Sequence, residues 1–405
     1  MWKLTKVAAV AAALAAAVAA HAGEVEVLHY WTSGGEAKSA AELKKMMQAK
    51  GHTWRDFAVA GGGGDSAMTV LKSRVISGNP PSAAQVKGPA IQEWASEGVL
   101  GNMDALAKSE KWDEALPKVV ADVMKYKGNY VAAPVNVHRV NWIWASSDAL
   151  KKAGVAAMPK TWDEFFAAAD KLKAAGLIPV AHGGQNWQDF TTFESVVLGV
   201  GGPKFYQDAL VKLDDKALTS DTMKKSLETF RRIKTYTDPG APGRDWNLAT
   251  AMLIQGKAGF QLMGDWAKGE FIAAGKAPGK DFMCAAAPGT ANAFTFNVDS
   301  FILFKLKDAA AQKAQSDLAS AIMSPGFQEV FNLNKGSIPV RAGQSMDKFD
   351  DCAKASAKDF ADTAKSGGLV PSVAHGMAIA PATEGAIKDA VSQFWNDDKV
   401  SVADA

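Results

Sequence analysis

Alternation between strand and helix patterns over the first hundred residues is the feature that most constrains the fold of this chain. Val25–Tyr30 alternates apolar and polar residues as a short strand does. The glycine-bearing turn Trp31–Glu36 follows, and Ala37–Gln48 then has the pattern of an amphipathic helix. Two more strand–helix pairs come next, at Thr53–Ala60 with Ala67–Ser77 and at Ala83–Val86 with Ile91–Glu97. This βαβαβα order predicts an α/β fold in which a mainly parallel sheet is flanked by helices.

Residues 1–22 have the pattern of a secretory signal peptide. They contain two lysines, an apolar run of Ala, Val and Leu, and a small-x-small end at Ala20–Ala22. The alternative is a membrane anchor, but the apolar run is short for a bilayer span. The sequence therefore predicts an exported, soluble mature chain. Its remaining length is too great for one compact core, so we expect two domains.

The charge balance and the motif content exclude several classes of function. The chain has 45 basic and 43 acidic residues, and two of the lysines lie in the signal peptide. A nearly neutral mature chain without a basic stripe does not predict a nucleic-acid partner. The six histidines are scattered, and neither a CxxC nor an HExxH pattern occurs. We therefore expect neither a metal nor a cofactor.

Two local patterns predict where helices begin. Gly61–Gly64 does not have the spacing of a phosphate-binding loop, so it predicts a flexible turn before a helix capped by Asp65. Thr161 and Glu164 have the spacing of a capping box.

The two cysteines, Cys284 and Cys352, predict a disulfide, because an even pair in an exported protein is usually bridged. On the chain-entropy account, a loop of this length stabilises the fold by roughly 4 kcal/mol.

Two long segments in the middle of the chain have strand character. Asn129–Trp144 has a proline in its middle, and we interpret it as a strand that crosses between the two domains. Phe294–Lys305 is predicted to be a strand that returns to the first domain.

Polar loops at strand ends recur in both halves of the chain, and tryptophan accompanies most of them. Trp31 and Trp266 each lie in a polar turn at the end of a strand. A tryptophan face suits stacking on the C–H face of a pyranose ring. The alternative for each tryptophan is that it fills the core.

Six segments together resemble the glucose-binding members of the periplasmic sugar-binding proteins, in the maltose-binding-like group of the extracellular solute-binding family. They keep their order over the mature chain and read YWTSGGE, GGGGDSAMTVLKSRVISGNPP, QVKGPAIQEWASEGVL, PVNVHRVNWIW, MGDWAKGEF and FNVDSF. The resemblance implies two α/β lobes with a ligand cleft between them and hinge closure around the ligand. It also implies a monomer in the periplasm that is not an enzyme and that delivers a monosaccharide to the inner-membrane permease subunits of an ABC-type importer.

The same resemblance implies how the lobes divide the chain. We assign residues 23–135 and 288–338 to an N-terminal lobe, and residues 136–287 and 339–405 to a C-terminal lobe.

The resemblance further implies a set of ligand contacts. The eight residues are Trp31, Glu36, Lys87, Trp266, Asn297, Asp299, Lys335 and His375. A carboxylate such as Asp299 can accept hydrogen bonds from two adjacent sugar hydroxyls, while Lys87 and Lys335 can donate to hydroxyl oxygens.

Some of these residues have other interpretations. Glu36 stands three residues after Ser33, so the two also fit a capping box. His375 also fits a histidine at the end of a helix. His138, Arg139 and Asn141 lie on the predicted crossing, and we interpret them as hinge or rim residues.

Two other functions compete with glucose binding. An exported glycoside hydrolase needs two carboxyl groups beside the scissile bond, and Glu36 with Asp299 is the pair available. The nearby lysines would lower the pKa of such an acid rather than raise it, which disfavours catalysis. The second alternative keeps the binding role but changes the sugar to mannose, galactose or maltose. Bulky side chains around the expected site favour a small ligand, with glucose first.

Overall fold

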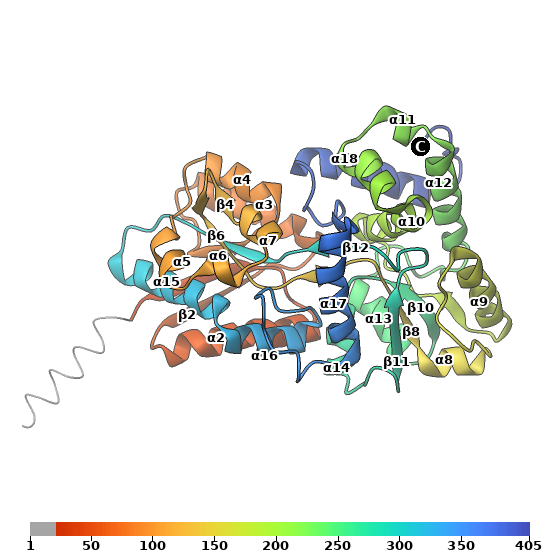
Figure 1. Cartoon of the computed structure of the whole chain (residues 1–405), viewed down its shortest axis with the longest axis horizontal. Coiled ribbons are helices and arrows are strands. Elements are labelled where there is room, and N and C mark those ends of the chain that lie inside the picture. The colour runs from red at the N-terminus through yellow and green to blue at the C-terminus, as the bar shows by residue number, and fades with distance from the viewer. Residues whose placement is uncertain (1–21) are drawn as a thin grey trace, which may run out of the picture.

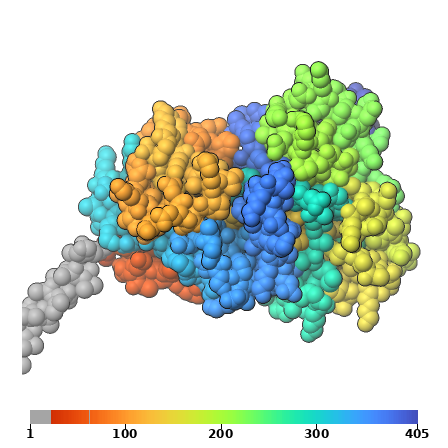
Figure 2. Space-filling view, in the orientation of Figure 1, coloured from red at the N-terminus to blue at the C-terminus, as the bar shows by residue number. Residues whose placement is uncertain are grey.

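The chain folds into two lobes that lie side by side, each with its own sheet (Figure 1). The computed structural model describes residues 22–405, so the predicted signal peptide lies outside the described residues except for Ala22. Strand β12 (Phe294–Asn297) and helix α17 (Asp351–Ser366) lie between the lobes. In the space-filling view the orange N-terminal segments and the yellow-green middle segments occupy opposite ends, with blue C-terminal segments between them (Figure 2).

The N-terminal lobe is built on a five-stranded sheet in the order β2-β1-β3-β13-β6. Its strands are β1 (Glu24–His29), β2 (Thr53–Ala58), β3 (Ala83–Gln85), β6 (Ala132–Pro134) and β13 (Ser300–Leu303). Strand β1 pairs in parallel with β2 and β3, whereas β13 is antiparallel to both β3 and β6. All strands but β13 therefore run in one direction, and the sheet is mainly parallel, as predicted.

Helices cover this sheet, and α2 packs against α15 and α16. They are α2 (Gly34–Ala49), α3 (Asp65–Ile76), α4 (Pro89–Ser96), α5 (Asp104–Ser109), α6 (Trp112–Ala115), α7 (Lys118–Val123), α15 (Ala309–Met323) and α16 (Pro325–Lys335). A short hairpin, β4 (Lys125–Tyr126) and β5 (Asn129–Tyr130), completes the lobe.

The C-terminal lobe is built on a four-stranded sheet in the order β11-β8-β10-β9. Its strands are β8 (Trp142–Ser146), β9 (Ile178–Val180), β10 (Ala258–Leu262) and β11 (Phe282–Ala286). Strand β8 is antiparallel to β10 and β11, and the other three strands share one direction. The helices are α8 (Ser147–Lys152), α9 (Trp162–Ala174), α10 (Asn186–Tyr206), α11 (Asp215–Leu218), α12 (Asp221–Lys234), α13 (Trp246–Ile254), α14 (Ala267–Ala273) and α18 (Pro381–Asn396).

A small third sheet links the lobes, in the order β14-β12-β7. It contains β7 (His138–Arg139), β12 and β14 (Leu369–Pro371). The crossing predicted at Asn129–Trp144 and the return to the first domain predicted at Phe294–Lys305 are confirmed, but neither segment is one continuous strand. Each segment divides into short strands in different sheets, because a chain that passes from one sheet to another leaves the first ladder of hydrogen bonds.

Two helix starts differ from their predictions, and a third helix begins after Thr161 as predicted but has only half of its capping box. Helix α2 begins at Gly34, three residues early, and its Glu36 Oε2 accepts from the N–H of Ser33 at 3.4 Å, as in a capping box. Helix α3 is capped by Gly64, which has φ 116°, so Asp65 lies in the first turn instead. Thr161 Oγ1 accepts a hydrogen bond from the N–H of Glu164, as in a capping box. The Glu164 carboxylate, however, accepts from the backbone N–H of Lys160, which is one residue before the cap.

Each lobe has its own apolar core. Buried Val27 and Phe301 belong to the core of the N-terminal lobe, and Ile143 and Phe230 to that of the C-terminal lobe. A third cluster around Trp144 packs between β8 and the helices α13 and α14. Among residues 22–405, none of the helices combines the length and the apolar character that crossing a bilayer requires.

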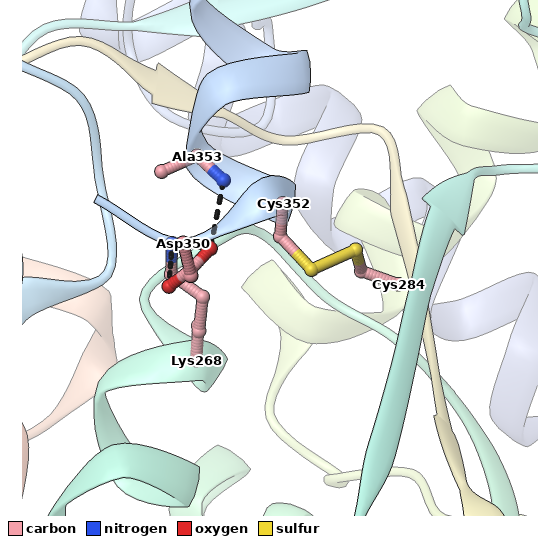
Figure 3. The surroundings of a disulfide bond; sticks show 5 residues. All are labelled: Lys268, Cys284, Asp350, Cys352 and Ala353. Carbon is pink, nitrogen blue, oxygen red and sulfur yellow. Dashed lines mark hydrogen bonds and ion pairs between the residues drawn. A yellow bond between two sulfur atoms is a disulfide. The ribbon is translucent and has the colours of Figure 1, made fainter. Parts of the chain in front are cut away.

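The predicted disulfide is present and ties α17 to the C-terminal lobe. Cys284 lies on β11 and Cys352 in the first turn of α17, with their Cα atoms 6.2 Å apart (Figure 3). Asp350 lies beside this bond, where it accepts from the N–H of Ala353 at 2.9 Å and pairs with Lys268 at 3.0 Å. The start of α17 is therefore held by a covalent bond and by an ion pair.

Replacing both cysteines with serine should lower the free energy of unfolding by about 4 kcal/mol, because the bond closes a loop of 68 residues. Urea denaturation of the variant and of the oxidised wild type measures the difference. As a control, a thiol assay on denatured, unreduced wild-type protein should detect no free thiol. Two free thiols in that assay would contradict the bond.

Candidate functional site

A cavity of about 680 Å³ opens between the lobes, and residues from both lobes line it. All eight residues that the sequence predicted as ligand contacts lie in its wall: Trp31, Glu36, Lys87, Trp266, Asn297, Asp299, Lys335 and His375. They come from the ends of β1, β3, β10, β12 and β14, from the first turn of α2 and from the last residue of α16. The fold thus brings together residues that lie far apart in the sequence.

Asp299 is a buried carboxylate with several donors around it. Its Oδ2 accepts from His138 Nε2 at 2.9 Å and from Asn136 Nδ2 at 3.2 Å. Its Oδ1 accepts from Gln85 Nε2 at 3.2 Å, and Lys87 Nζ lies 4.0 Å away. Burial acts to raise the pKa of Asp299, but His138 and the lysines hold that pKa well below its ordinary value. The carboxylate is therefore ionised and can accept hydrogen bonds from a ligand.

His138 bridges two carboxylates. Its Nδ1 contacts Asp265 Oδ1, while its Nε2 contacts Asp299. Ionised carboxylates are acceptors, so these two contacts favour the imidazolium form, in which both ring nitrogens donate. Burial acts to lower the pKa of His138, but the two carboxylates outweigh it and the pKa is raised.

The three residues assigned to the hinge or rim have different roles in the structure. His138 lies on β7 of the linking sheet, and its side chain also lines the cavity. Arg139 instead pairs with Asp359 on α17 at 2.6 Å. Asn141 donates to Thr290 at 2.9 Å. The sequence offered no signal for the contact of His138 with the cavity, because its two carboxylate partners are distant in the chain.

Glu36 and Lys335 form an ion pair in the cavity wall. Glu36 lies in the first turn of α2 and Lys335 is the last residue of α16, positions where the helix dipoles favour these charges. Glu36 thus caps its helix and also faces the cavity. Nearby, burial lowers the pKa of the Lys87 ammonium.

Trp31 and Trp266, which the sequence predicted as ligand contacts, are both buried, and each belongs to an apolar core cluster as well as to the cavity wall. Trp31 is almost fully buried, and its ring packs against Phe301 and Phe331 at centroid distances of 5.4 and 5.1 Å. Most of the Trp31 surface therefore fills the core of the N-terminal lobe. Trp266 packs against His138 at 5.2 Å and against His375 at 4.8 Å. The Trp266 ring is thus in contact with two other residues of the cavity wall.

His375 lies in a turn after β14, so its interpretation as a helix-end histidine is wrong. Burial lowers the pKa of His375 well below its ordinary value, which keeps the ring neutral. Its Nε2 has no hydrogen-bond partner among residues 22–405, and neither has Asn297 Oδ1. Buried polar atoms of this kind normally bind a protein group, a water or a ligand. Both residues line the cavity, although these two atoms are themselves buried in its wall.

Charges around Asp299 and Glu36 are balanced, whereas the rest of the cavity wall adds Asp65, Asp245, Glu384 and Asp389 against Lys388. Three carboxylates and three cationic side chains cluster there: Glu36, Asp265 and Asp299 with Lys87, His138 and Lys335. Within residues 22–405, no group of three His, Cys, Asp or Glu side chains is arranged to hold a metal ion. A balanced set of donors and acceptors suits an uncharged polar ligand.

Sequence reasoning missed several residues of the cavity wall. Trp187 packs against Trp266 at 6.4 Å and against His375 at 5.8 Å, and its Nε1 donates to Gln185. A signal for Trp187 existed, because it follows a polar loop at the end of β9. Other lining residues are Tyr30, Asp65, Gln85, Gln185, Trp246, Glu384, Lys388 and Asp389.

The raised pKa of His138 makes a prediction about stability. The pKa of His138 is raised in the folded state above its ordinary value of 6.5. The protonated ring therefore stabilises the fold to its full extent below pH 6.5. The contribution is then lost as the pH rises through the folded-state pKa. Asp265→Asn removes one carboxylate and should lower the pKa of His138, so the contribution should be smaller and its loss should be complete at lower pH. NMR titration of the imidazole, with urea denaturation from about pH 6 to 9, measures both effects. An unchanged titration in the variant would contradict the assignment.

Comparison with known proteins extends these observations. The family model of the bacterial extracellular solute-binding proteins matches residues 30–320. A probable sugar-binding periplasmic protein of Brucella suis biovar 1 (strain 1330) is 49% identical over 404 residues, which cover 98% of this chain and 95% of the relative. A solved chitin oligosaccharide binding protein has a TM-score of 0.78 at 18% identity, and the match covers 95% of this chain and 96% of that one. The bacterial solute receptor AcbH, described as preferring β-D-galactopyranose exclusively, has a TM-score of 0.78 at 19% identity, with 94% and 96% covered.

The solved structures confirm the predicted two-lobed α/β fold. The family and the relative confirm the predicted location in the periplasm. The family model matches most of the described residues, and one relative is nearly half identical along almost the whole chain. This chain belongs to the family of bacterial extracellular solute-binding proteins.

Proposed function

We propose that this protein binds a monosaccharide, with glucose first, and delivers it unchanged to the permease subunits of an ABC-type importer. The observation that carries the proposal is that all eight expected sugar contacts line one cavity between the lobes. The relative named as a sugar-binding periplasmic protein also supports it.

The chemistry of the wall suits a sugar. A pyranose presents hydroxyls that both donate and accept, and an apolar C–H face. The ionised Asp299 accepts from adjacent hydroxyls, and Lys87 and Lys335 donate to hydroxyl oxygens. Asn297 Oδ1 and His375 Nε2 supply two more polar atoms that lack protein partners in the described part of the chain. Each would gain a hydrogen bond when the sugar enters.

Closure of the lobes would follow the predicted division of the chain. We propose an N-terminal lobe of residues 23–135 and 288–338, and a C-terminal lobe of residues 136–287 and 339–405. The linking sheet supports hinge bending, because β12 pairs with β7 and with β14 outside the two main sheets. Helix α17 adjoins both lobes, since its Phe360 packs in the N-terminal core while its Cys352 is bonded to β11.

The same geometry favours binding over hydrolysis. A glycoside hydrolase needs one protonated carboxyl group as a general acid. The lowered pKa of Asp299 keeps that group ionised, and Glu36 is paired with Lys335. We therefore propose no catalytic role for either residue.

An oligosaccharide such as maltose is the second candidate. The cavity volume of about 680 Å³ is within the range of sites that hold drug-sized ligands and exceeds the space of one pyranose ring. Further polar and aromatic side chains, including Gln185, Trp246 and Lys388, extend the lining beyond the eight expected contacts. A second sugar ring would find partners among them.

Isothermal titration of the ligand-free mature protein with glucose, mannose, galactose and maltose tests the proposal. We expect glucose to bind one to one and most tightly, and to be recovered intact by chromatography. A preference for maltose would replace the monosaccharide by the disaccharide, and a hydrolysed product would favour the enzyme. No heat with any of these sugars would refute the proposed ligand class.

Asp299→Ala should weaken glucose binding by more than about 2 kcal/mol, or about thirtyfold, because hydrogen bonds to a charged group contribute about that much. Titration calorimetry of the variant measures the change, and circular dichroism confirms that it is folded. Asp189→Asn is the matched control, since Asp189 is also a buried carboxylate but binds His182 and Ser392 away from the cavity. Wild-type affinity in Asp299→Ala would remove this residue from the site.

A further inference from the structure

Glu194 is a fully buried carboxylate in the middle of α10, outside the cavity wall. Its Oε1 accepts from Ser372 Oγ at 2.6 Å. Its Oε2 accepts from the hydroxyl of Tyr206 at 2.7 Å and from the N–H groups of Val373 and Ala374 at 3.0 and 3.2 Å. Three of these four donors belong to three consecutive residues, so Glu194 is an anchor for that one segment.

The anchored segment leads directly into the cavity wall. Ala374, His375 and Gly376 all line the cavity. On its other side the segment lies close to the loop of Lys87, since a Cβ atom built on Gly88 would come within 2.0 Å of the carbonyl oxygen of Gly376. A small shift of this segment would therefore change the position of His375 relative to Lys87.

A carboxylate in an apolar core is costly unless donors surround it. Glu194 obtains its donors from residues 372–374 and from Tyr206, so its charge is stabilised only while the segment keeps this conformation. The Ser372 N–H also donates to the carbonyl of Phe296 on β12 at 2.9 Å, next to Asn297. The segment is thus held between α10 and the linking sheet.

We propose that Glu194 is a positioning residue for ligand binding, which acts through Ser372, Val373 and Ala374 to fix His375 in the cavity wall. The inference rests on the proposed function, because it concerns how tightly the same cavity holds a sugar. Glu194 itself does not touch the ligand.

The ionisation of Glu194 provides a way to test this role. Burial raises the pKa of Glu194 to about 7. The titratable side chain in contact with it is Tyr206, whose pKa burial and Glu194 raise well above the ordinary value, and His375 on the anchored segment stays neutral. Protonation weakens Glu194 as an acceptor for the two backbone N–H groups, so the segment is held less firmly at lower pH. If the ionised form is the one that binds, apparent affinity should rise with pH by up to about tenfold between pH 6 and 8, as the ionised fraction rises.

Titration calorimetry with glucose at several pH values compares wild type with three variants. Glu194→Gln keeps the shape and removes the charge, so it should bind more weakly than wild type at pH 8 and lose the rise in affinity due to Glu194, keeping only the dependence due to His138. Ser372→Ala removes one donor and should weaken binding while keeping the pH dependence. Asp189→Asn is the matched control on the same buried helix, and it should keep both the affinity and the pH dependence of wild type.

Tryptophan fluorescence of the ligand-free protein separates this inference from the proposed function. Trp266 and Trp187 lie 4.8 and 5.8 Å from the ring of His375, so their emission should respond when the segment moves. Wild type should show a transition near pH 7, and Glu194→Gln should lack it. Wild-type protein that binds none of the sugars would refute the proposed function, and the fluorescence would still decide the role of Glu194. Wild-type affinity, pH dependence and fluorescence in Glu194→Gln would overturn the inference.

Discussion

The rest of the structure depends on one interaction, in which an imidazole contacts two buried carboxylates. This contact lies where the chain crosses between its sheets. Asp265 follows β10 of the C-terminal sheet, Asp299 precedes β13 of the N-terminal sheet, and His138 joins them from the linking sheet. Each carboxylate would be costly to bury alone, and breaking such a cluster leaves an uncompensated charge. The cluster therefore couples the relative position of the two lobes to the charge of the cavity.

From this cluster the cavity obtains its chemical character. The imidazolium occupies one oxygen of Asp299, and the other oxygen lies near Gln85 and Lys87. Around Asp299 and Glu36 the carboxylates and cations pair with one another, so this part of the wall offers strong donors and acceptors without a large net charge. A neutral ligand rich in hydroxyl groups is the kind of molecule that such a wall binds best, and this links the electrostatics of the crossing to the proposed sugar.

Sequence patterns were most informative where the structure is local. Strand and helix signals placed β1, β2 and α4 within a few residues, because burial alternates with the period of each element. They failed at Asn129–Trp144 and Phe294–Lys305, where an apolar run reads as one strand even though it passes through several sheets. The start of α2 was also misplaced, because Gly34 and Gly35 favoured a turn, whereas Glu36 and the distant Glu270 bind N–H groups at this helix start.

The sequence by itself determined the α/β class, the pairing of Cys284 with Cys352, and, through the family resemblance, which eight residues would meet at one cavity. Only the tertiary structure decided how those residues are held. His138 meets carboxylates 127 and 161 positions away, and Glu194 binds donors 178 to 180 positions away. The periodicity of a sequence reports which side of an element is buried, but it carries no information about which distant polar group will satisfy a buried charge. That choice follows from how the sheets and helices pack, and it sets the pKa values and the rigidity of the cavity wall.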